Sequence, residues 1–162
     1  MDDDRRDDTH TADLHGHAVQ VRGFDEAALV EGMARTTVPF NELVGLRFTL
    51  VSPDRVEATL QVRPEHHQPS GVVHGGVYAT LVEAVGSTGS VAHVAAEGKL
   101  AMGVHNATSF LRPTTEGVLT AVATPIHLGR TQHLWDVRVT RADGSLTAKG
   151  ELRVAVVEPR TP

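Results

Sequence analysis

The sequence contains no cysteine, few aromatic residues and no long uninterrupted apolar segment. Without cysteine there can be no disulfide framework, no zinc–thiolate site and no thiol nucleophile. Aromatic residues make up only 4% of the chain, and charges of the two signs nearly balance beyond the first 17 residues, which argues against a nucleic-acid-binding surface. The longest apolar stretch, residues 72–96, is interrupted by His74, Glu83 and His93, which argues against a membrane span.

The first 22 residues differ in composition from the rest of the chain. They are rich in aspartate, threonine and histidine and poor in aliphatic residues, so we expect a disordered acidic tail whose histidines could hold a metal only loosely. A length of 162 residues suits one domain, which we place at residues 23–158, followed by a short tail at 159–162. The acidic start does not resemble a signal peptide, so we expect a soluble, cytoplasmic protein.

The pattern of apolar residues in this domain predicts an α+β fold. A short amphipathic helix is predicted from Phe24 to Met33 and is expected to end before Pro39. A second, longer helix over residues 77–92 is apolar or small on all sides, which is typical of a helix enclosed by protein. Six runs alternate or are rich in β-formers and predict an antiparallel sheet: residues 46–51, 56–63, 100–111, 118–127, 133–141 and 146–157.

Glu83 is the only charged side chain on the long helix. A lone carboxylate in such surroundings is costly unless it is paired, protonated or used in chemistry, and no Lys or Arg stands at helical spacing to neutralise it. We therefore interpret Glu83 as a functional residue. Ser87 follows one helical turn later and is expected on the same face.

Two glycines, Gly75 and Gly76, follow His74 where the chain enters the helix. Their unobstructed N–H groups and the helix dipole could stabilise a carbonyl oxygen that acquires negative charge, although glycines also occur at such junctions for steric reasons alone. Gly75 and Glu83 are eight residues apart, roughly 12 Å along a helix. One carbonyl group cannot reach both, so a shared reaction requires two copies of the chain.

Several segments together resemble the hotdog-fold acyl-CoA thioesterases of the PaaI-like and 4-hydroxybenzoyl-CoA thioesterase type. The resemblance spans about residues 38–157 and departs from some relatives, which carry Asp at the position of Glu83 or His near the position of Ser109 and Phe110. The segments that carry it are His67-Gln68-Pro69-Ser70-Gly71-Val72-Val73-His74-Gly75-Gly76, Glu83 with Gly86-Ser87, Phe110-Leu111-Arg112-Pro113 and His127-Leu128-Gly129-Arg130-Thr131-Gln132.

The resemblance implies a hotdog fold, in which a curved antiparallel sheet wraps one long central helix, and homodimers formed by sheet extension, commonly paired into homotetramers. It also implies an active site at the dimer interface. By position, Glu83 would attack the thioester or activate water, and the Gly75 N–H would polarise the thioester carbonyl. Gln68 would hydrogen-bond the same carbonyl or orient the acyl group. His74 would support this geometry, and Ser87 would position water or Glu83.

The expected reaction is hydrolysis of an aryl- or medium-chain acyl-CoA to the free acid and CoA. CoA is part of the substrate, and no cofactor, metal, nucleic acid or membrane is expected to take part. Gly76, Arg112 and Arg130 are the expected substrate- and CoA-binding residues. The leaving thiol could equally belong to a carrier protein.

Four other interpretations of the sequence are considered, two of them within the same fold. Hotdog folds also include enoyl-thioester hydratases or dehydratases, which pair a His with a carboxylate, and non-catalytic acyl-CoA-binding modules. His66, His67 and His74 could be a metal cluster, although they lack the spacing of a helical His pair. A Ser-His-Asp hydrolase is disfavoured because no G-x-S-x-G motif is present.

Overall fold

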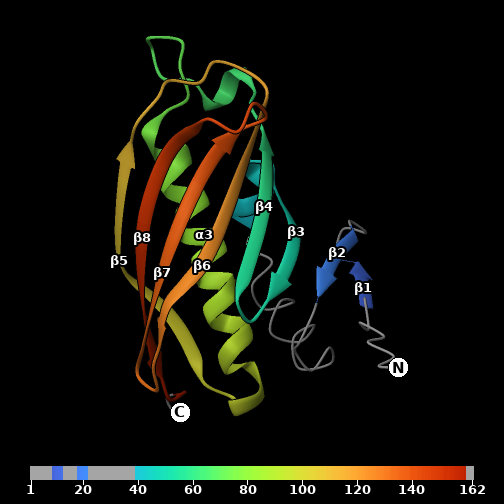
Figure 1. Cartoon of the computed structure of the whole chain (residues 1–162), viewed down its shortest axis with the longest axis vertical. Helices are drawn as coiled ribbons and strands as arrows, with labels where there is room; N and C mark the ends of the chain where they lie inside the picture. Colours follow the sequence, from blue (N-terminus) through green and yellow to red (C-terminus); the bar gives the residue numbers. More distant parts are fainter. Residues whose placement is uncertain (1–8, 13–17, 22–38, 160–162) are drawn as a thin grey trace, which may run out of the picture.

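The computed structural model describes residues 9–12, 18–21 and 39–159. Its central element is one long helix, and most of the remaining residues form a single sheet (Figure 1). The elements in chain order are β1 (Thr9–Ala12), β2 (Ala18–Val21), α2 (Pro39–Leu43), β3 (Leu46–Ser52), β4 (Arg55–Gln61), the 3₁₀ turn η1 (Pro64–His66), α3 (Gly75–Val94), the 3₁₀ turn η2 (Ala95–Glu97), β5 (Leu100–Phe110), β6 (Val118–Leu128), β7 (Gln132–Arg141) and β8 (Leu146–Val157).

The sheet has eight strands in the order β1-β2-β3-β4-β6-β7-β8-β5. All neighbouring strands are antiparallel except β2 and β3, which pair in parallel. The six strands from β3 to β8 match the six predicted strands. Because β5 crosses over to the far side of β8, it forms one edge of the sheet.

Three expectations for the N-terminal part need comment. The segment predicted as a disordered tail, residues 1–22, includes β1 and β2, which pair with each other, and β2 also pairs with β3. The helix predicted from Phe24 to Met33 lies outside the described residues. Pro39 does not simply end a helix, because it begins the short helix α2, where a proline costs nothing at the first helical position.

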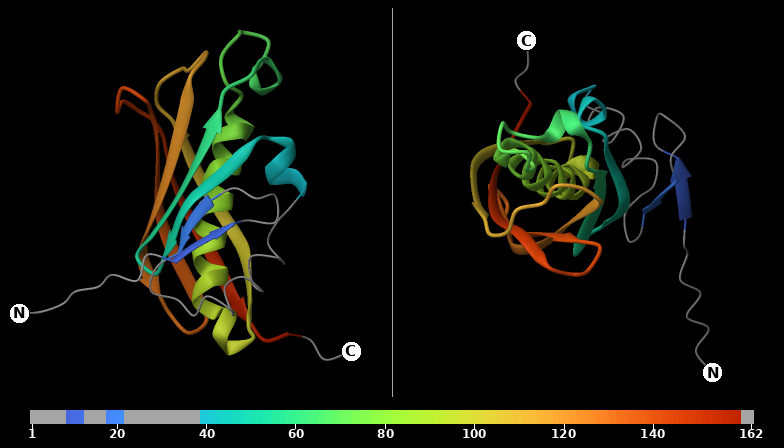
Figure 2. Two further views of the ribbon diagram at one scale, coloured as in Figure 1. Left: turned by 90° about the vertical axis from the view of Figure 1, so that its right-hand side faces the viewer. Right: turned by 90° about the horizontal axis from the view of Figure 1, so that it is seen from above.

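The concave face of the sheet wraps α3, as the view along the helix shows (Figure 2). This confirms the predicted arrangement of a sheet around one enclosed helix. The core-facing residues of β4 alternate along the strand, so that Val56, Ala58 and Leu60 are buried against α3. Within the described residues, no helix is long and apolar enough to cross a membrane.

Gly86 and Gly89 allow the sheet to approach the helix closely. A Cβ atom at Gly86 would lie 2.6 Å from Leu152 Cδ2, and one at Gly89 would lie 2.5 Å from Trp135 Cη2. Trp135 is fully buried, and its indole N–H donates to Ser90 Oγ at 2.8 Å. The helix propensity that the two glycines lose is therefore exchanged for close packing against two large core side chains.

Candidate active site

Glu83 lies in the middle of α3 and is half-buried. Ser87 Oγ donates a hydrogen bond to Glu83 Oε1 at 2.9 Å, so the predicted shared face of these two residues is correct. Asn106 of β5 donates from Nδ2 to the other carboxylate oxygen, Oε2, at 3.3 Å. No ion pair in the described part of the chain includes Glu83. Within the described part of the chain, the carboxylate is therefore held by neutral donors and is not neutralised by a cation.

A cavity of about 470 Å³ opens beside this carboxylate, and we call it the carboxylate pocket. Ala79, Thr80 and Ala84 of α3 supply small side chains around Glu83, which leaves the space over the carboxylate open. The complete lining is Phe40, Asn41, Ala79, Thr80, Glu83, Ala84, Ser87, Thr88 and Asn106.

His74 is the N-cap residue of α3. Its Nδ1 accepts the N–H of Gly76 at 2.8 Å, which satisfies one of the free donors at the helix start. The Gly75 N–H has no hydrogen-bond partner in the described residues. Of the two predicted glycine donors, Gly75 is therefore the one that can bind a ligand oxygen, and His74 fixes the backbone beside it.

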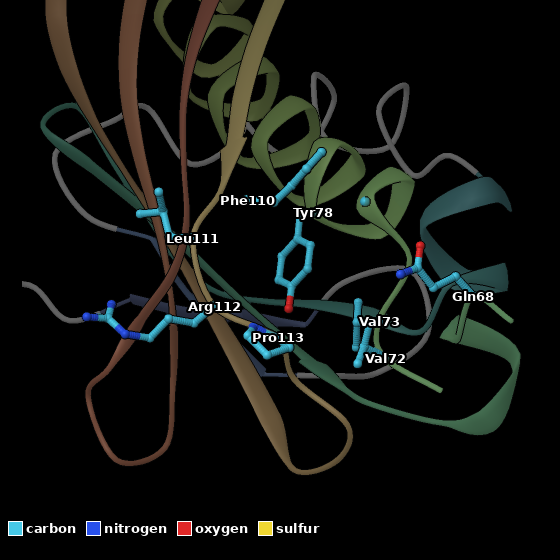
Figure 3. A pocket seen from close by; sticks show the side chains of 9 residues that line it. Gln68, Val72, Val73, Tyr78, Phe110, Leu111, Arg112 and Pro113 are labelled. Carbon is cyan, nitrogen blue, oxygen red and sulfur yellow. The ribbon is translucent and has the colours of Figure 1, made fainter. Parts of the chain in front are cut away.

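A second cavity, of about 210 Å³, lies at this end of α3, and we call it the helix-start pocket. Gln68 and Arg112 lie on opposite sides of it, with Tyr78 between them (Figure 3). Arg112 is exposed, and its Nη1 donates to the carbonyl oxygen of Leu146 at 2.7 Å. The complete lining is Gln68, Val72, Val73, Gly75, Tyr78, Phe110, Leu111, Arg112 and Pro113.

The predicted site residues thus fall into two groups. Glu83 and Ser87 border the carboxylate pocket, whereas Gln68, Gly75 and Arg112 border the helix-start pocket. His74 and Gly76 flank Gly75 in the chain and line neither pocket. Arg130 lies in the turn between β6 and β7 and lines neither pocket. Within one chain, the carboxylate and the free helix N–H therefore face different cavities.

The histidines near the helix start do not form a metal site. His66 is buried, and its Nδ1 accepts the N–H of Arg63 at 3.0 Å. Burial, with a smaller contribution from Arg63, lowers the pKa of His66. His67 Nε2 lies 2.8 Å from the carbonyl oxygen of Thr115. Among the described residues, no three His, Cys, Asp or Glu side chains are placed to hold a metal ion.

Two residues near Glu83 were missed in the sequence. Asn106 contacts the carboxylate directly, and Gly103 lies so close that a Cβ there would come within 2.1 Å of Glu83 Oε1. Both belong to a segment that the pattern predicts only as a strand. The polar side chain of Asn106 among apolar residues of this strand could have indicated a functional role. Its position in the sequence alone does not show which face of the strand it occupies.

Comparisons with known proteins identify the family of this chain. A profile of the thioesterase superfamily matches residues 70–148. Rv1847 of Mycobacterium tuberculosis, which is named as a candidate esterase, is 40% identical over 126 residues that cover 76% of this chain and 90% of that protein. The chain belongs to the thioesterase superfamily. The resemblance found in the sequence is thereby confirmed.

Solved structures of related proteins confirm the hotdog fold. The structure of Rv1847 has a TM-score of 0.74 and covers 76% of this chain and 100% of its own. A variant of the thioesterase PA1618 from Pseudomonas aeruginosa has a TM-score of 0.73 at 34% identity, covering 80% and 93%. The proofreading thioesterase EntH of Cronobacter turicensis is 31% identical over 116 residues, which cover 72% of this chain and 84% of EntH. This thioesterase is therefore an enzyme of the thioester hydrolase class.

Proposed function

We propose that the protein hydrolyses an acyl-CoA thioester, with an aryl or medium-chain acyl group, in a site built from two copies of the chain. Glu83 of one copy acts on the thioester, while the Gly75 N–H and Gln68 of the other copy hold its carbonyl oxygen. The observation that carries this proposal is that the carboxylate and the free helix N–H are separated within one chain. Among the described residues, Glu83 has no cationic partner and borders one pocket, whereas Gly75, whose N–H has no partner there, borders another.

The chemistry follows from the groups present. As a general base, Glu83 would take a proton from water, the hydroxide would add to the carbonyl, and the C–S bond would break to give the acid and the CoA thiol. As a nucleophile, Glu83 would add to the carbonyl and expel the thiolate, and water would then hydrolyse the resulting anhydride. In either case the Gly75 N–H would stabilise the oxyanion of the tetrahedral intermediate.

The edge strand β5 supports a second copy. It is 11 residues long and, among the described strands, pairs with β8 alone. Met102 and Val104 on this strand are each 57% exposed. A long, uncharged edge strand with exposed apolar side chains is a surface that natural proteins normally cover. Pairing of β5 with β5 of a second copy would cover it, and we propose a homodimer that forms in this way.

Two arginines are proposed to contact the CoA phosphates. Arg112 borders the helix-start pocket and is exposed, so its free guanidinium nitrogens could bind a phosphate there. Arg130 could contribute only if the CoA extended past the β6–β7 turn of either copy. Arg112 is therefore the stronger candidate of the two.

Replacing Glu83 tests the reaction. Glu83→Gln keeps the volume and the contact to Ser87 but removes the charge, and we expect kcat to fall about 10²–10⁴-fold, the range for loss of a general base. The measurement is CoA thiol release from benzoyl-, phenylacetyl-, hydroxybenzoyl- and medium-chain acyl-CoAs, with size-exclusion chromatography and circular dichroism as controls for assembly and fold. Full hydrolysis by this variant would refute the proposed role. An enoyl-CoA assayed alongside would detect hydration, and binding without turnover would indicate a binding module.

Replacing Gly75 tests the oxyanion site. Gly75→Pro removes the N–H at a position where proline suits the helix, because His74 before it is extended, with φ −64° and ψ 139°. Gly75→Ala is the matched control. Like proline, alanine adds a Cβ at this position, 2.8 Å from Phe110 Cζ, but it retains the N–H. We expect kcat to fall at least about 10²-fold in Gly75→Pro, as on loss of an oxyanion donor, and far less in Gly75→Ala.

Mixing the two inactive variants tests whether the site is shared. A heterodimer of Glu83→Gln and Gly75→Pro chains has one site with both groups intact and one with neither. Random mixing should therefore restore about a quarter of the wild-type rate in a symmetric dimer. A mixture that stays inactive although heterodimers are detected by mass spectrometry would exclude the shared site.

A further inference from the structure

β5 does not alternate regularly along its length. Gly103 pairs with Val154 and His105 pairs with Arg153, so Val104 has no partner on β8 and forms a β-bulge. A bulge inserts one residue into a strand and reverses the face on which the following side chains lie. Such bulges occur next to active sites, where they redirect a side chain.

This bulge brings two positions of β5 onto the face that meets Glu83. In a regular strand, residues three apart lie on opposite faces. Here a Cβ at Gly103 would lie 2.1 Å from Glu83 Oε1, while the Asn106 amide nitrogen lies 3.3 Å from Oε2. Gly103 therefore leaves room for the carboxylate, and the bulge delivers Asn106 to it.

The orientation of the Asn106 amide is fixed by its other contacts. Nδ2 also donates to the carbonyl oxygen of Ala79 at 3.0 Å, and Oδ1 accepts from Thr108 Oγ1 at 2.7 Å. A flipped amide would direct Oδ1 at both the Ala79 carbonyl and the Glu83 carboxylate, which are acceptors only. The Thr108 hydroxyl can donate or accept, so Ala79 and Glu83 decide the orientation. The NH₂ group faces the carboxylate.

We propose that Asn106 is a positioning residue for Glu83, an inference that rests on the proposed function of this carboxylate. Ser87 binds Oε1 and Asn106 binds Oε2, so both oxygens are held in place from opposite ends. A carboxylate has about four lone-pair positions, and these two bonds use one on each oxygen. The remaining lone pairs stay available to attack the thioester or to take a proton from water, in one fixed orientation.

Asn106→Asp tests the proposal because it replaces the donor NH₂ with an acceptor oxygen of the same size. We expect kcat to fall by about 10–100-fold through misorientation of Glu83, with KM changed by less than about threefold. The acid limb of the kcat/KM profile should also move to higher pH, since two adjacent carboxylates tend to share a proton. An unchanged kcat and pH profile would overturn the proposal. So would a loss of kcat without any shift of the acid limb, which would indicate a structural role alone.

Thr108 provides a second pair of variants if Asn106→Asp does not fold. Thr108→Val removes the hydroxyl that binds Oδ1 at nearly constant volume, and Thr108→Ser retains it. We expect Thr108→Val to lower kcat by about two- to tenfold with KM unchanged, as expected for slight misplacement of a catalytic group, and Thr108→Ser to keep the wild-type rate. Equal rates for the two variants would contradict the proposal. Full activity of Glu83→Gln would instead refute the proposed function, so the two failures are distinguishable.

Discussion

β5 and β8 are neighbours in the same sheet, paired at ten positions, yet they differ in burial and in the regularity of their alternation. β8 alternates between buried and exposed residues, and its inward side chains form part of the core. On β5, in contrast, no residue is fully buried, and the bulge at Val104 interrupts the alternation.

This difference separates two tasks within one sheet. β8 has a strand on each side and α3 on its inner face, so its apolar side chains contribute to stability through burial. β5 has a free edge, and its inward positions hold a glycine and an amide against Glu83. We therefore expect substitutions on β8 to change stability and substitutions on β5 to change activity.

The largest expected effect is on β8. Leu152 is fully buried and packs against Gly86 of α3. Leu152→Ala should lower the free energy of unfolding by about 2–5 kcal/mol, through lost burial and the cavity left behind. Urea denaturation at fixed protein concentration would measure this. Met102→Ala on β5, which is 57% exposed in a single chain, should cost less than about 1 kcal/mol when unfolding is measured where size-exclusion chromatography shows a monomer, because the proposed dimer would cover this side chain. Equal losses in the two variants would invalidate the contrast between the strands.

The same substitution, glycine to alanine, can be made on each strand and compares the effects of β8 and β5 directly. A Cβ at Gly150 of β8 would lie 2.7 Å from both methyl carbons of the buried Val82, so Gly150→Ala should cost about 1–3 kcal/mol by overpacking. A Cβ at Gly103 of β5 would instead displace the carboxylate of Glu83. Gly103→Ala should lower kcat by about 10²-fold, the cost of a misplacement of about 1 Å, with stability changed by less than about 0.5 kcal/mol.

Thiol-release kinetics and urea denaturation of both glycine variants provide the check. The comparison fails if Gly103→Ala keeps the wild-type kcat, because Glu83 would then not need the space that Gly103 leaves. It also fails if Gly150→Ala loses kcat but not stability, since β8 would then act on the reaction rather than on the core.

Regular parts of the fold could be predicted because each strand or helix repeats one simple pattern. The alternation of Val56, Ala58 and Leu60 follows directly from burial of one strand face. The apolar character of α3 on all sides indicates its enclosure, and the pairing of Glu83 with Ser87 follows from the helical repeat. The separation of Gly75 from Glu83 likewise follows from the number of helical residues between them.

The contribution of β5 to the site could not be predicted in this way. Regular alternation would put Met102, Val104 and Asn106 on one face of the strand. In the structure Met102 and Val104 are exposed while Asn106 contacts Glu83, because the bulge reverses the alternation after Gly103. A bulge depends on the pairing partner as well as on local sequence, so apolar periodicity does not reveal it.

The smallest expected effect is on the pH dependence of stability and comes from protonation of a histidine on a core strand. His133 of β7 is buried, with its ring 5.8 Å from that of His93. Burial, followed by the nearby His93 and His127, lowers the pKa of His133 below its ordinary value of 6.5. The unfolded chain therefore binds this proton more readily, so the contribution to stability is present above pH 6.5 and is lost as the pH falls below it.

Urea denaturation at pH 7.5 and pH 5.5 tests this assignment. We expect the wild type to lose stability between these pH values and His133→Gln to lose less of it. The pKa of His66 is also lowered by burial, so some pH dependence should persist in His133→Gln. Equal losses of stability in the wild type and in His133→Gln would contradict the assignment, because protons bind preferentially to the unfolded chain only where folding has removed an imidazole from water.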